Sequence, residues 1–498
     1  MLKIDKISQY QQCIRPRGSQ KVPVRFYVSE DLMPNYETIS QLVEVASNKH
    51  VFHHVAALTD IHQKPGRKNP SGSVVATKKY FLPQLIDTAP NCGMRLIATP
   101  FGEGDLSEKQ LDDLFNELVE VIPTKTYVGH GSPVSYKTAV EISRRGSVAL
   151  LESLKENTEE TQNIMMNGSM FEDEKISKED LYSAIPRMFF RIAQFRLGIL
   201  GMAGNHFLDL MKITDIIDEG LASEFNLKKN QYVFMMHTGS GLFGQYASYF
   251  YTPKQKEHLS QKAIMEISRF FFLNNEIGWH RTLETEIPKY KNKKEFFAID
   301  SESELGRNYF IAHRAAANHG FANRTMLQHN IKKAIKKVLK KDNATRLIYD
   351  MSHILATKEK HFGEDIIVHR NNATRAFGSK RMEGTSFERT GEPVFMPSSM
   401  STEAYFGVGT DENESTFFSA AHGTGKSKTK TSEVPQDKKE LLEKMKKRQI
   451  RLYNAQSKEV INQDASSYKD PAIAIEGMRV NKVMKPVAKM MPVAVLMA

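Results

Sequence analysis

Cysteine is nearly absent from this sequence. Its 498 residues contain two cysteines, Cys13 and Cys92, so at most one disulfide can form and a disulfide framework is excluded. Two thiols in a chain of this length are typical of a reducing compartment. The first residues lack the apolar core of a signal peptide, and no run of about 18 apolar residues is available to cross a membrane. We therefore predict a soluble, cytoplasmic protein without a membrane partner.

Acidic side chains are outnumbered by basic ones. The chain has 58 Asp and Glu against 69 Lys and Arg, which gives a formal net charge of +11. A basic balance favours a polyanionic partner such as nucleic acid or a nucleotide, although a solvated basic surface explains the charge equally well. The hydrophobic fraction of 40% is enough for a large core.

No linker or internal repeat separates independent cores before residue 427. We therefore predict one large, irregular α+β domain over residues 22–498, with mixed sheets and surrounding helices around a central metal and nucleotide cleft. Residues 1–21 are polar and basic and predict a flexible arm. Residues 152–180 predict an acidic surface insertion, and residues 427–438, rich in Lys, Ser and Thr, predict a mobile loop.

Periodicity places the regular elements only coarsely. Alternating or β-branched runs predict strands at 22–28, 51–58, 95–99 and a closing strand at 484–498. Helical spacing predicts helices at 36–48, 106–121, 136–155, 253–274, 307–340 and 437–454. The lysine-rich end of the fifth helix, residues 332–341, is better explained as a solvated helix face than as a nucleic-acid contact.

One short stretch carries phosphate-compatible chemistry, the apolar run that ends in His422-Gly423-Thr424-Gly425-Lys426. Glycine lets the backbone approach a bound group, and lysine supplies a point charge suited to phosphate. A neutral imidazole here can serve as ligand, base or nucleophile. The stretch is not a P-loop, because Ala420 occupies the position that requires the first glycine.

Five histidines share a pattern, in which a small-residue turn follows or ends an apolar run. They are His206, His237, His353, His369 and His422, and Cys92 lies in a similar turn. Each histidine alone is more often a hydrogen-bonded structural residue than a ligand. Together, a thiolate and several imidazoles suit zinc, manganese, iron or cobalt, and a thiolate can bridge two metals that clamp a phosphoryl transfer.

The ordered motifs resemble those of the RtcB family of RNA ligases, from about Val22 to the C-terminus. The motifs that carry the resemblance are Asp60-Ile61-His62, Asn91-Cys92-Gly93-Met94, Gly204-Asn205-His206-Phe207-Leu208-Asp209, His237-Thr238-Gly239-Ser240, Ala315-Ala316-Ala317-Asn318 with Ala322-Asn323-Arg324, Tyr349-Asp350-Met351-Ser352-His353, Val368-His369-Arg370-Asn371-Asn372-Ala373-Thr374-Arg375, Pro397-Ser398-Ser399-Met400-Ser401-Thr402 and His422-Gly423-Thr424-Gly425-Lys426.

The resemblance implies a GTP- and manganese-dependent ligase that joins RNA ends carrying a 2′,3′-cyclic phosphate or 3′-phosphate to 5′-hydroxyl ends. His422 falls on the nucleophile that forms a covalent nucleotide intermediate. The implied ligands of two Mn²⁺ ions are Cys92, His206, His237 and His353. The implied nucleotide contacts are Asn205, His206, Phe207, Leu208, Asp209, His353, Pro397, Ser398, Ser399, Met400, His422, Gly423, Thr424, Gly425 and Lys426. From charge alone, Arg95, Arg370 and Arg375 are hypothesised to hold RNA phosphates.

The sequence departs from the family pattern at the metal and base contacts. Ala89 stands where the family has an aspartate ligand, and Asp87 is the alternative carboxylate. Ile354, Ala404 and Met497 replace polar groups of the family's nucleotide pocket. The expected partner is RNA with broken ends, such as tRNA, and an activator protein stays open. A related nucleotidyl transfer, such as end capping or specialised RNA repair, and a degenerate RNA-binding homologue are the alternative functions.

Overall fold

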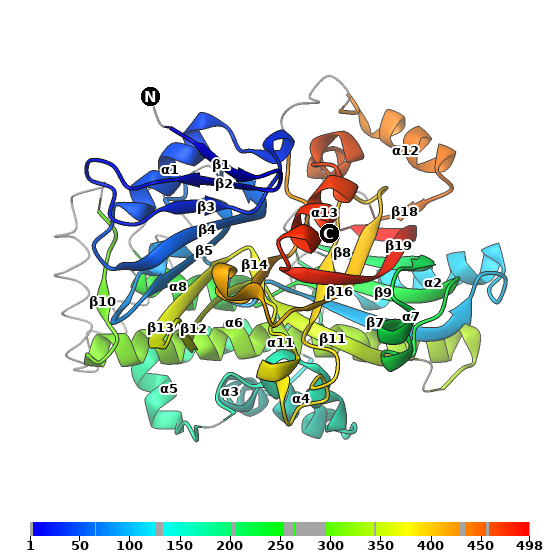
Figure 1. Ribbon diagram of the computed structural model, residues 1–498. Coiled ribbons are helices and arrows are strands. Elements are labelled where there is room, and N and C mark those ends of the chain that lie inside the picture. The colour runs from blue at the N-terminus through cyan, green and yellow to red at the C-terminus, as the bar shows by residue number, and fades with distance from the viewer. Residues whose placement is uncertain are drawn as a thin grey trace.

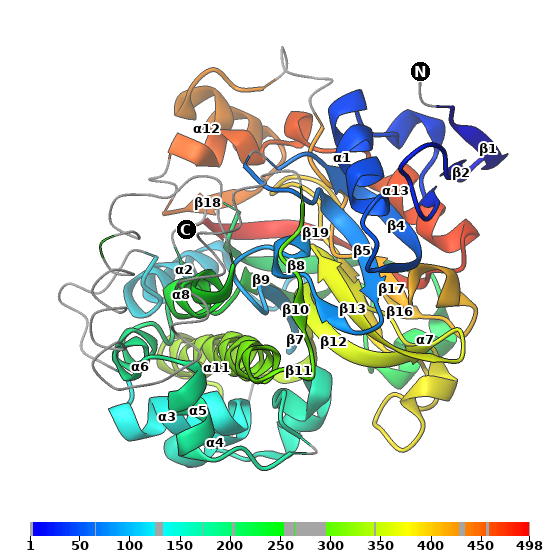
Figure 2. The ribbon, with the colours of Figure 1, turned by 90° about the vertical axis from the view of Figure 1, so that its left-hand side faces the viewer.

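The computed structural model describes residues 3–64, 66–124, 133–172, 174–201, 205–252, 263, 295–342, 345–427, 434–454 and 458–497. Within these residues, helices pack around two large sheets (Figures 1 and 2). Both sheets are mixed, because parallel pairs such as β3–β4 and β18–β19 occur among antiparallel ones. The predicted α+β class with mixed sheets is confirmed.

The first sheet has the strand order β1-β2-β3-β4-β5-β13-β12. Its strands are β1 (Asp5–Ser8), β2 (Gln11–Ile14), β3 (Val24–Phe26), β4 (Val51–His62), β5 (Ser71–Thr77), β12 (Ile354–His361) and β13 (Glu364–Asn371). The prediction of a flexible arm over residues 1–21 is wrong. Residues 5–14 form a hairpin that extends the sheet edge, because Gln12 and Ile14 are buried where β2 pairs with β3.

The second sheet runs β11-β7-β9-β8-β19-β16-β15, and β18 pairs with β19 beside this path. Its strands are β7 (Gly93–Gly102), β8 (Phe207–Ile216), β9 (Gln231–Thr238), β11 (Arg346–Ser352), β15 (Pro393–Met396), β16 (Ala404–Gly409), β18 (Arg451–Tyr453) and β19 (Met484–Met497). The expected closing strand is therefore confirmed as β19. Its ladder is irregular near Pro486 and Pro492, since proline has no N–H to donate.

Two short ladders complete the strands, β6 (Tyr80–Phe81) with β10 (Ile299–Asp300) and β14 (Ala373–Arg375) with β17 (Ser419–Ala421). The helices are α1 (Tyr36–Ala46), α2 (Glu108–Val121), α3 (Tyr136–Arg145), α4 (Ser147–Leu154), α5 (Lys178–Ala184), α6 (Arg187–Gln194), α7 (Glu219–Glu224), α8 (Gly241–Tyr251), α11 (Glu304–Leu339), α12 (Lys438–Lys447) and α13 (Pro471–Val480). Short 3₁₀ turns are η1 (Glu30–Leu32), η2 (Pro83–Leu85), η3 (Glu159–Asn163), η4 (Met165–Gly168), η5 (Ser379–Met382), η6 (Asn413–Thr416), η8 (Lys458–Gln463) and η9 (Ala465–Ser467).

Two predicted helices are shorter than expected. The helix expected over 136–155 is split at Gly146, which has φ +61° and lies so close to Gly168 that a Cβ would be 1.9 Å from its carbonyl oxygen. The helix expected over 437–454 ends at Lys447, and the chain then forms β18. The helix expected over 253–274 lies outside the described residues, apart from position 263. Residues 428–433 of the loop predicted at 427–438 also lie outside them.

The long helix α11 runs beneath both sheets, with α3, α4 and α5 on its other side (Figure 1). Its basic end is neutralised within the molecule, since Lys332 pairs with Glu156 and Glu160 and Lys337 pairs with Glu117. The interpretation as a solvated helix face is therefore favoured. Glu156 and Glu160 come from the stretch predicted as a surface insertion, which also buries apolar side chains such as Ile164 and Met165 in the core, whereas Glu117 lies on α2. No described helix is both long enough and apolar enough to span a membrane.

Candidate active site

Four of the sequence-predicted metal ligands meet where strands of the second sheet end. Cys92 precedes β7, His206 precedes β8, His237 lies near the end of β9, and His353 joins β11 to β12. The Cys92 Sγ atom lies 3.5 Å from His206 Nε2 and 3.2 Å from His237 Nε2, and His237 Nε2 lies 3.0 Å from His353 Nε2. One ligand atom each from Cys92, His237 and His353 lie within 4.8 Å of one another.

Backbone carbonyls fix the orientation of two of these imidazoles. His206 Nδ1 donates to Leu200 O at 3.0 Å, and His237 Nδ1 donates to Asn205 O at 2.8 Å. A carbonyl only accepts, so each Nδ1 carries the hydrogen and each Nε2 directs a lone pair toward Cys92. Burial lowers the pKa of His237 to about 3 and that of His353 well below its ordinary value. Both rings are therefore neutral, as metal ligands must be.

The donor set fits a divalent transition metal. A thiol and neutral imidazoles converge on one point, and the pKa of Cys92 is lowered because nearby His206 outweighs the effect of burial. The alternative carboxylate, Asp87, does not join the group. It is held in ion pairs with Lys64 and Arg67 instead. Among the described residues the cluster thus has sulfur and nitrogen donors without a carboxylate, a set that can hold zinc, manganese, iron or cobalt.

His422 stands beside this cluster, directly after β17. Its ring stacks on His353 with centroids 3.9 Å apart. His422 Nδ1 donates to Asn372 O at 2.9 Å, and Asp60 Oδ2 also lies 2.9 Å away. Burial alone would lower the pKa of His422, but the Asp60 carboxylate raises it overall. Because Nδ1 is occupied, Nε2 is the nitrogen left to act as a nucleophile.

Asp60 is a site residue that sequence reasoning noticed only as part of a motif. It lies near the end of β4, and Lys469 Nζ donates at 2.8 Å to the carbonyls on either side of it, Thr59 O and Ile61 O. Gly425, with φ +81°, packs so closely that a Cβ would lie 2.7 Å from Asp60 Oδ1. The turn after His422 thus needs glycine at this position. Lys469 could not be recognised as a site residue from the sequence, because no local motif surrounds it.

A cavity of about 500 Å³ opens in front of His422. Most predicted nucleotide contacts line it: Asn205, Phe207, Asp209, Pro397, Ser398, Ser399, Met400, His422, Gly423, Thr424, Gly425 and Lys426. The prediction for Leu208 is wrong, because side chains alternate along β8 and Leu208 faces the core. Cys92, His206 and His353 lie behind the cavity wall, and His237 reaches it.

One wall of this cavity is rich in methionine. Met94, Met211, Met235 and Met497 line it, together with Ala404. Asp209 lies among them on β8, is 5% exposed, and has one carboxyl oxygen without a hydrogen-bond partner in the described structure. Burial raises the pKa of Asp209 well above its ordinary value. A buried polar group that faces a cavity without a partner is suited to bind a ligand.

The structure contradicts the hypothesis that three arginines hold RNA phosphates. Arg95 and Arg370 are each 1% exposed and pair with Asp350 and Glu359. Arg375 is partly buried, with 12% of its side chain exposed, and its charge is paired with Glu392 at 2.8 Å. A sequence-based charge argument could not distinguish these internal ion pairs from a phosphate-binding surface.

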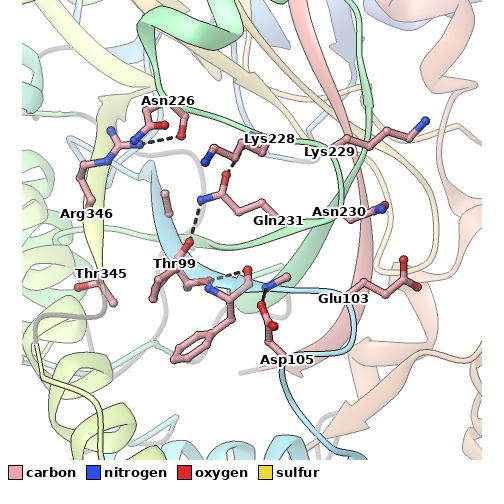
Figure 3. Close-up of a pocket in the computed structure, with 14 residues that line it drawn as sticks. Thr99, Glu103, Asp105, Asn226, Lys228, Lys229, Asn230, Gln231, Thr345 and Arg346 are labelled. Carbon is pink, nitrogen blue, oxygen red and sulfur yellow. Dashed lines mark hydrogen bonds between the residues drawn. The ribbon is translucent and has the colours of Figure 1, made fainter.

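A second cavity, of about 530 Å³, lies at the opposite end of β7 and β9 (Figure 3). Its lining includes Lys228, Lys229 and Arg346, but the Arg346 guanidinium already donates to Phe225 O at 2.7 Å. None of its lining residues is a histidine or cysteine, so the chemistry described above belongs to the cavity at His422.

The fold and the site together define a protein with one cysteine and three histidines clustered behind a cavity that His422 lines. The family model described as tRNA-splicing ligase RtcB matches residues 41–498. The chain belongs to the RtcB family. It is 29% identical over 520 residues to a tRNA-splicing ligase RtcB of Methanococcus maripaludis and 27% identical over 516 residues to one of Nanoarchaeum equitans, in each case over 99% of both chains. A Pyrobaculum aerophilum protein of the same name is 28% identical over 521 residues.

Proposed function

We propose that this protein is an RNA ligase that joins 2′,3′-cyclic phosphate or 3′-phosphate ends to 5′-hydroxyl ends, using GTP and Mn²⁺. The observation that supports this most is the position of His422. The Nδ1 atom of His422 is held by Asp60 and Asn372. Its Nε2 atom forms no hydrogen bond with the residues that the structure describes, and the ring lines a cavity of nucleotide size. A cluster that could bind a metal adjoins it. The substrate is RNA with broken ends, such as tRNA.

The first step is attack of His422 Nε2 on the α-phosphorus of GTP. An N–P bond forms, the bond to the bridging oxygen breaks, and pyrophosphate leaves with the electron pair. The imidazole becomes positively charged while Nδ1 keeps its hydrogen, so the Asp60 carboxylate stabilises the developing charge. A 2′,3′-cyclic phosphate end is opened by water to the 3′-phosphate before it takes part. The N–P bond to His422 then breaks as the nucleotide passes to the RNA 3′-phosphate, and attack by the 5′-hydroxyl on that phosphate releases GMP.

The metal would be held by Cys92, His237 and His353, with His206 on the other side of the thiolate. When bound, it would neutralise phosphate charge and orient the reacting oxygens. We propose Mn²⁺, probed alongside Co²⁺ and Zn²⁺ because the described donor set has no carboxylate. Two ions that share the Cys92 sulfur agree with its contacts to imidazoles on both sides.

Nucleotide contacts are proposed for the residues that line the cavity around His422. The turn Gly423–Lys426 and Lys64 would face phosphates, and the methionine-rich wall would take the base. Asp209 is the carboxyl group of that wall, and its oxygens can accept from the N–H groups of guanine. Ala404 and Met497 supply no donor for the guanine carbonyl oxygen. An unpaired buried oxygen costs about 1–3 kcal/mol, so we expect the preference for GTP over ATP to be about 5- to 150-fold smaller than in a pocket that supplies such a donor.

The test is sealing of a split RNA. One fragment carries a 2′,3′-cyclic phosphate and the other a 5′-hydroxyl, and the purified protein is supplied with GTP and each metal in turn. A sealed product that requires His422 and nucleotide supports the proposal. Transfer of the nucleotide to an RNA end without sealing would favour the capping or repair alternative. Salt-sensitive RNA binding without either product would favour a degenerate homologue.

The same reaction can be used to detect an activator protein. If the purified chain alone seals RNA once and then stops, repeated turnover needs a further protein. Sustained turnover would exclude that need.

A further inference from the structure

Helix α11 presses one face against the turns that carry the metal ligands. Gly320, Asn323 and Arg324 share this face, because residues three and four apart are neighbours on a helix. Gly320 lies so close to the Cys92 turn that a Cβ would be 2.5 Å from Asn91 O. Figure 2 shows α11 end-on, next to β7 and β11.

The Arg324 guanidinium, 0% exposed, joins two ligand turns directly. Its Nη1 donates to Asn91 O at 3.1 Å and to Thr238 O at 2.8 Å, and these residues adjoin Cys92 and His237. Its Nη2 donates to the Asn91 side chain at 2.8 Å. Asn91 has φ +56°, a conformation that this side-chain contact helps to hold.

The same guanidinium reaches the strand that leads to the third ligand. Its Nε and Nη2 donate to Asp350 at 2.6–3.0 Å, and Asp350 lies on β11 just before His353. Arg95 donates to Asp350 from the other side at 2.6 Å. Two buried arginines thus share one buried carboxylate.

Asn323 fastens the segment that orients His206. Its Oδ1 accepts from Gly198 N at 2.8 Å, and its Nδ2 donates at 3.1 Å to Ile199 O and Gly239 O. The next residue, Leu200, accepts the Nδ1 hydrogen of His206. The two neighbouring residues Asn323 and Arg324 therefore connect to every segment that carries one of the four ligands.

We propose that Arg324, together with Asn323, is a positioning residue that sets the spacing of the metal ligands. Neither side chain touches the ligand atoms, so its effect passes through the backbone of the turns. This role goes beyond the proposed ligase reaction, because it concerns how the metal site is held whichever reaction follows. Residues of this kind typically change metal affinity by about 10- to 100-fold when altered.

The central variant is Arg324→Lys. A lysine keeps the buried charge but is a point donor, and cannot donate at once to Asn91, Thr238 and Asp350 as the planar fork does. We expect Co²⁺ to bind at least 10-fold more weakly to this variant. We also expect the thiolate-to-cobalt absorption to be weaker, because Cys92 is no longer held toward the ion.

The matched control is Arg375→Lys, which alters a partly buried arginine paired with the buried carboxylate of Glu392. Each apo protein is titrated with Co²⁺ alone, and the dissociation constant and thiolate absorption are recorded without nucleotide or RNA. The proposal holds if Arg375→Lys binds like wild type and Arg324→Lys does not. It is overturned if Arg324→Lys stays within threefold of wild type with full thiolate absorption, or if both variants weaken equally.

A second variant guards against misfolding of the first. Gly320→Ala removes no charge and no hydrogen bond, but its Cβ would displace the Asn91 turn. It should weaken Co²⁺ binding and thiolate absorption while the far-ultraviolet circular dichroism stays unchanged. Wild-type cobalt binding in Gly320→Ala would count against the proposal. Because cobalt binding needs neither GTP nor RNA, this outcome is separate from success or failure of the ligase assay.

Discussion

Replacing Asp60 by asparagine should slow nucleotide transfer to His422 without removing the metal site. Asp60 lies 2.9 Å from His422 Nδ1 and is almost fully buried. The substitution keeps the shape of the side chain and removes its charge. Lys469 and Gly425 hold the backbone on both sides of position 60, so the turn itself should persist.

The size of the effect follows from what the carboxylate does in the first step. The imidazole gains positive charge as Nε2 bonds to phosphorus, and a hydrogen bond to a charged partner contributes about 1.5–3 kcal/mol. That range corresponds to a rate loss of about 10- to 150-fold. An asparagine amide can also donate toward Nδ1 and favour the hydrogen on Nε2, the attacking atom. Asn372 O opposes this shift, since it still accepts from Nδ1.

The assay is the single-turnover rate of covalent labelling by α-labelled GTP at saturating nucleotide and metal. Asp60→Ala separates the two effects, because it removes the charge without adding a donor. We expect Asp60→Asn to be as slow as Asp60→Ala or slower. Asp87→Asn serves as the matched control, since Asp87 is also buried and ion-paired but does not contact His422. A rate for Asp60→Asn within threefold of wild type would refute the reasoning.

Four further predictions concern a buried ion pair, RNA binding, metal content and nucleotide preference. Burial would raise the pKa of Glu359, but the neighbouring Arg370 lowers it overall, to below 4.5. The ion pair therefore stabilises the fold above pH 4.5, and this stabilisation is lost as the pH falls. Glu359→Gln should melt at a temperature well below that of wild type at pH 7, and the difference in melting temperature should narrow below pH 4.5. Arg370→Gln should lower the melting temperature and leave the salt dependence of RNA binding unchanged, whereas a phosphate contact would reduce the slope by about 1. Cys92→Ser should lower the amount of bound metal measured by elemental analysis, and an unchanged metal content would contradict this. Met497→Lys should increase the ratio of GTP to ATP labelling, because lysine supplies a donor near the base, and an unchanged ratio would contradict that expectation.

Much of the site was predictable from local sequence because its parts lie in recognisable turns. Cys92 and His206 directly precede apolar strands, His237 lies near the end of one and His353 follows one, and strand ends of one sheet gather at an edge. The apolar, proline-interrupted end of the chain was correctly assigned as a closing strand. These signals depend on neighbouring residues only, which is why a single sequence carries them.

Charge and long-range contacts were the parts that the sequence could not supply. An arginine in a sequence gives no indication of whether it binds RNA or a buried carboxylate. Only the fold shows that Asp350 lies beside Arg95 and that Glu359 lies beside Arg370. The partner of His422 at Asp60 comes from a strand more than 300 residues earlier. The hairpin at residues 5–14 was missed because its exposed strand is polar and its stability comes from pairing with β3.

The account rests on His422 as the residue that becomes covalently attached to a nucleotide. The most direct measurement is to incubate the protein with α-labelled GTP and Mn²⁺, Co²⁺ or Zn²⁺, and to map the label by mass spectrometry. We predict an acid-labile adduct on His422 that is absent from His422→Ala. The absence of any adduct with GTP or ATP under all three metals, or a label mapped to another residue, would contradict the central claim.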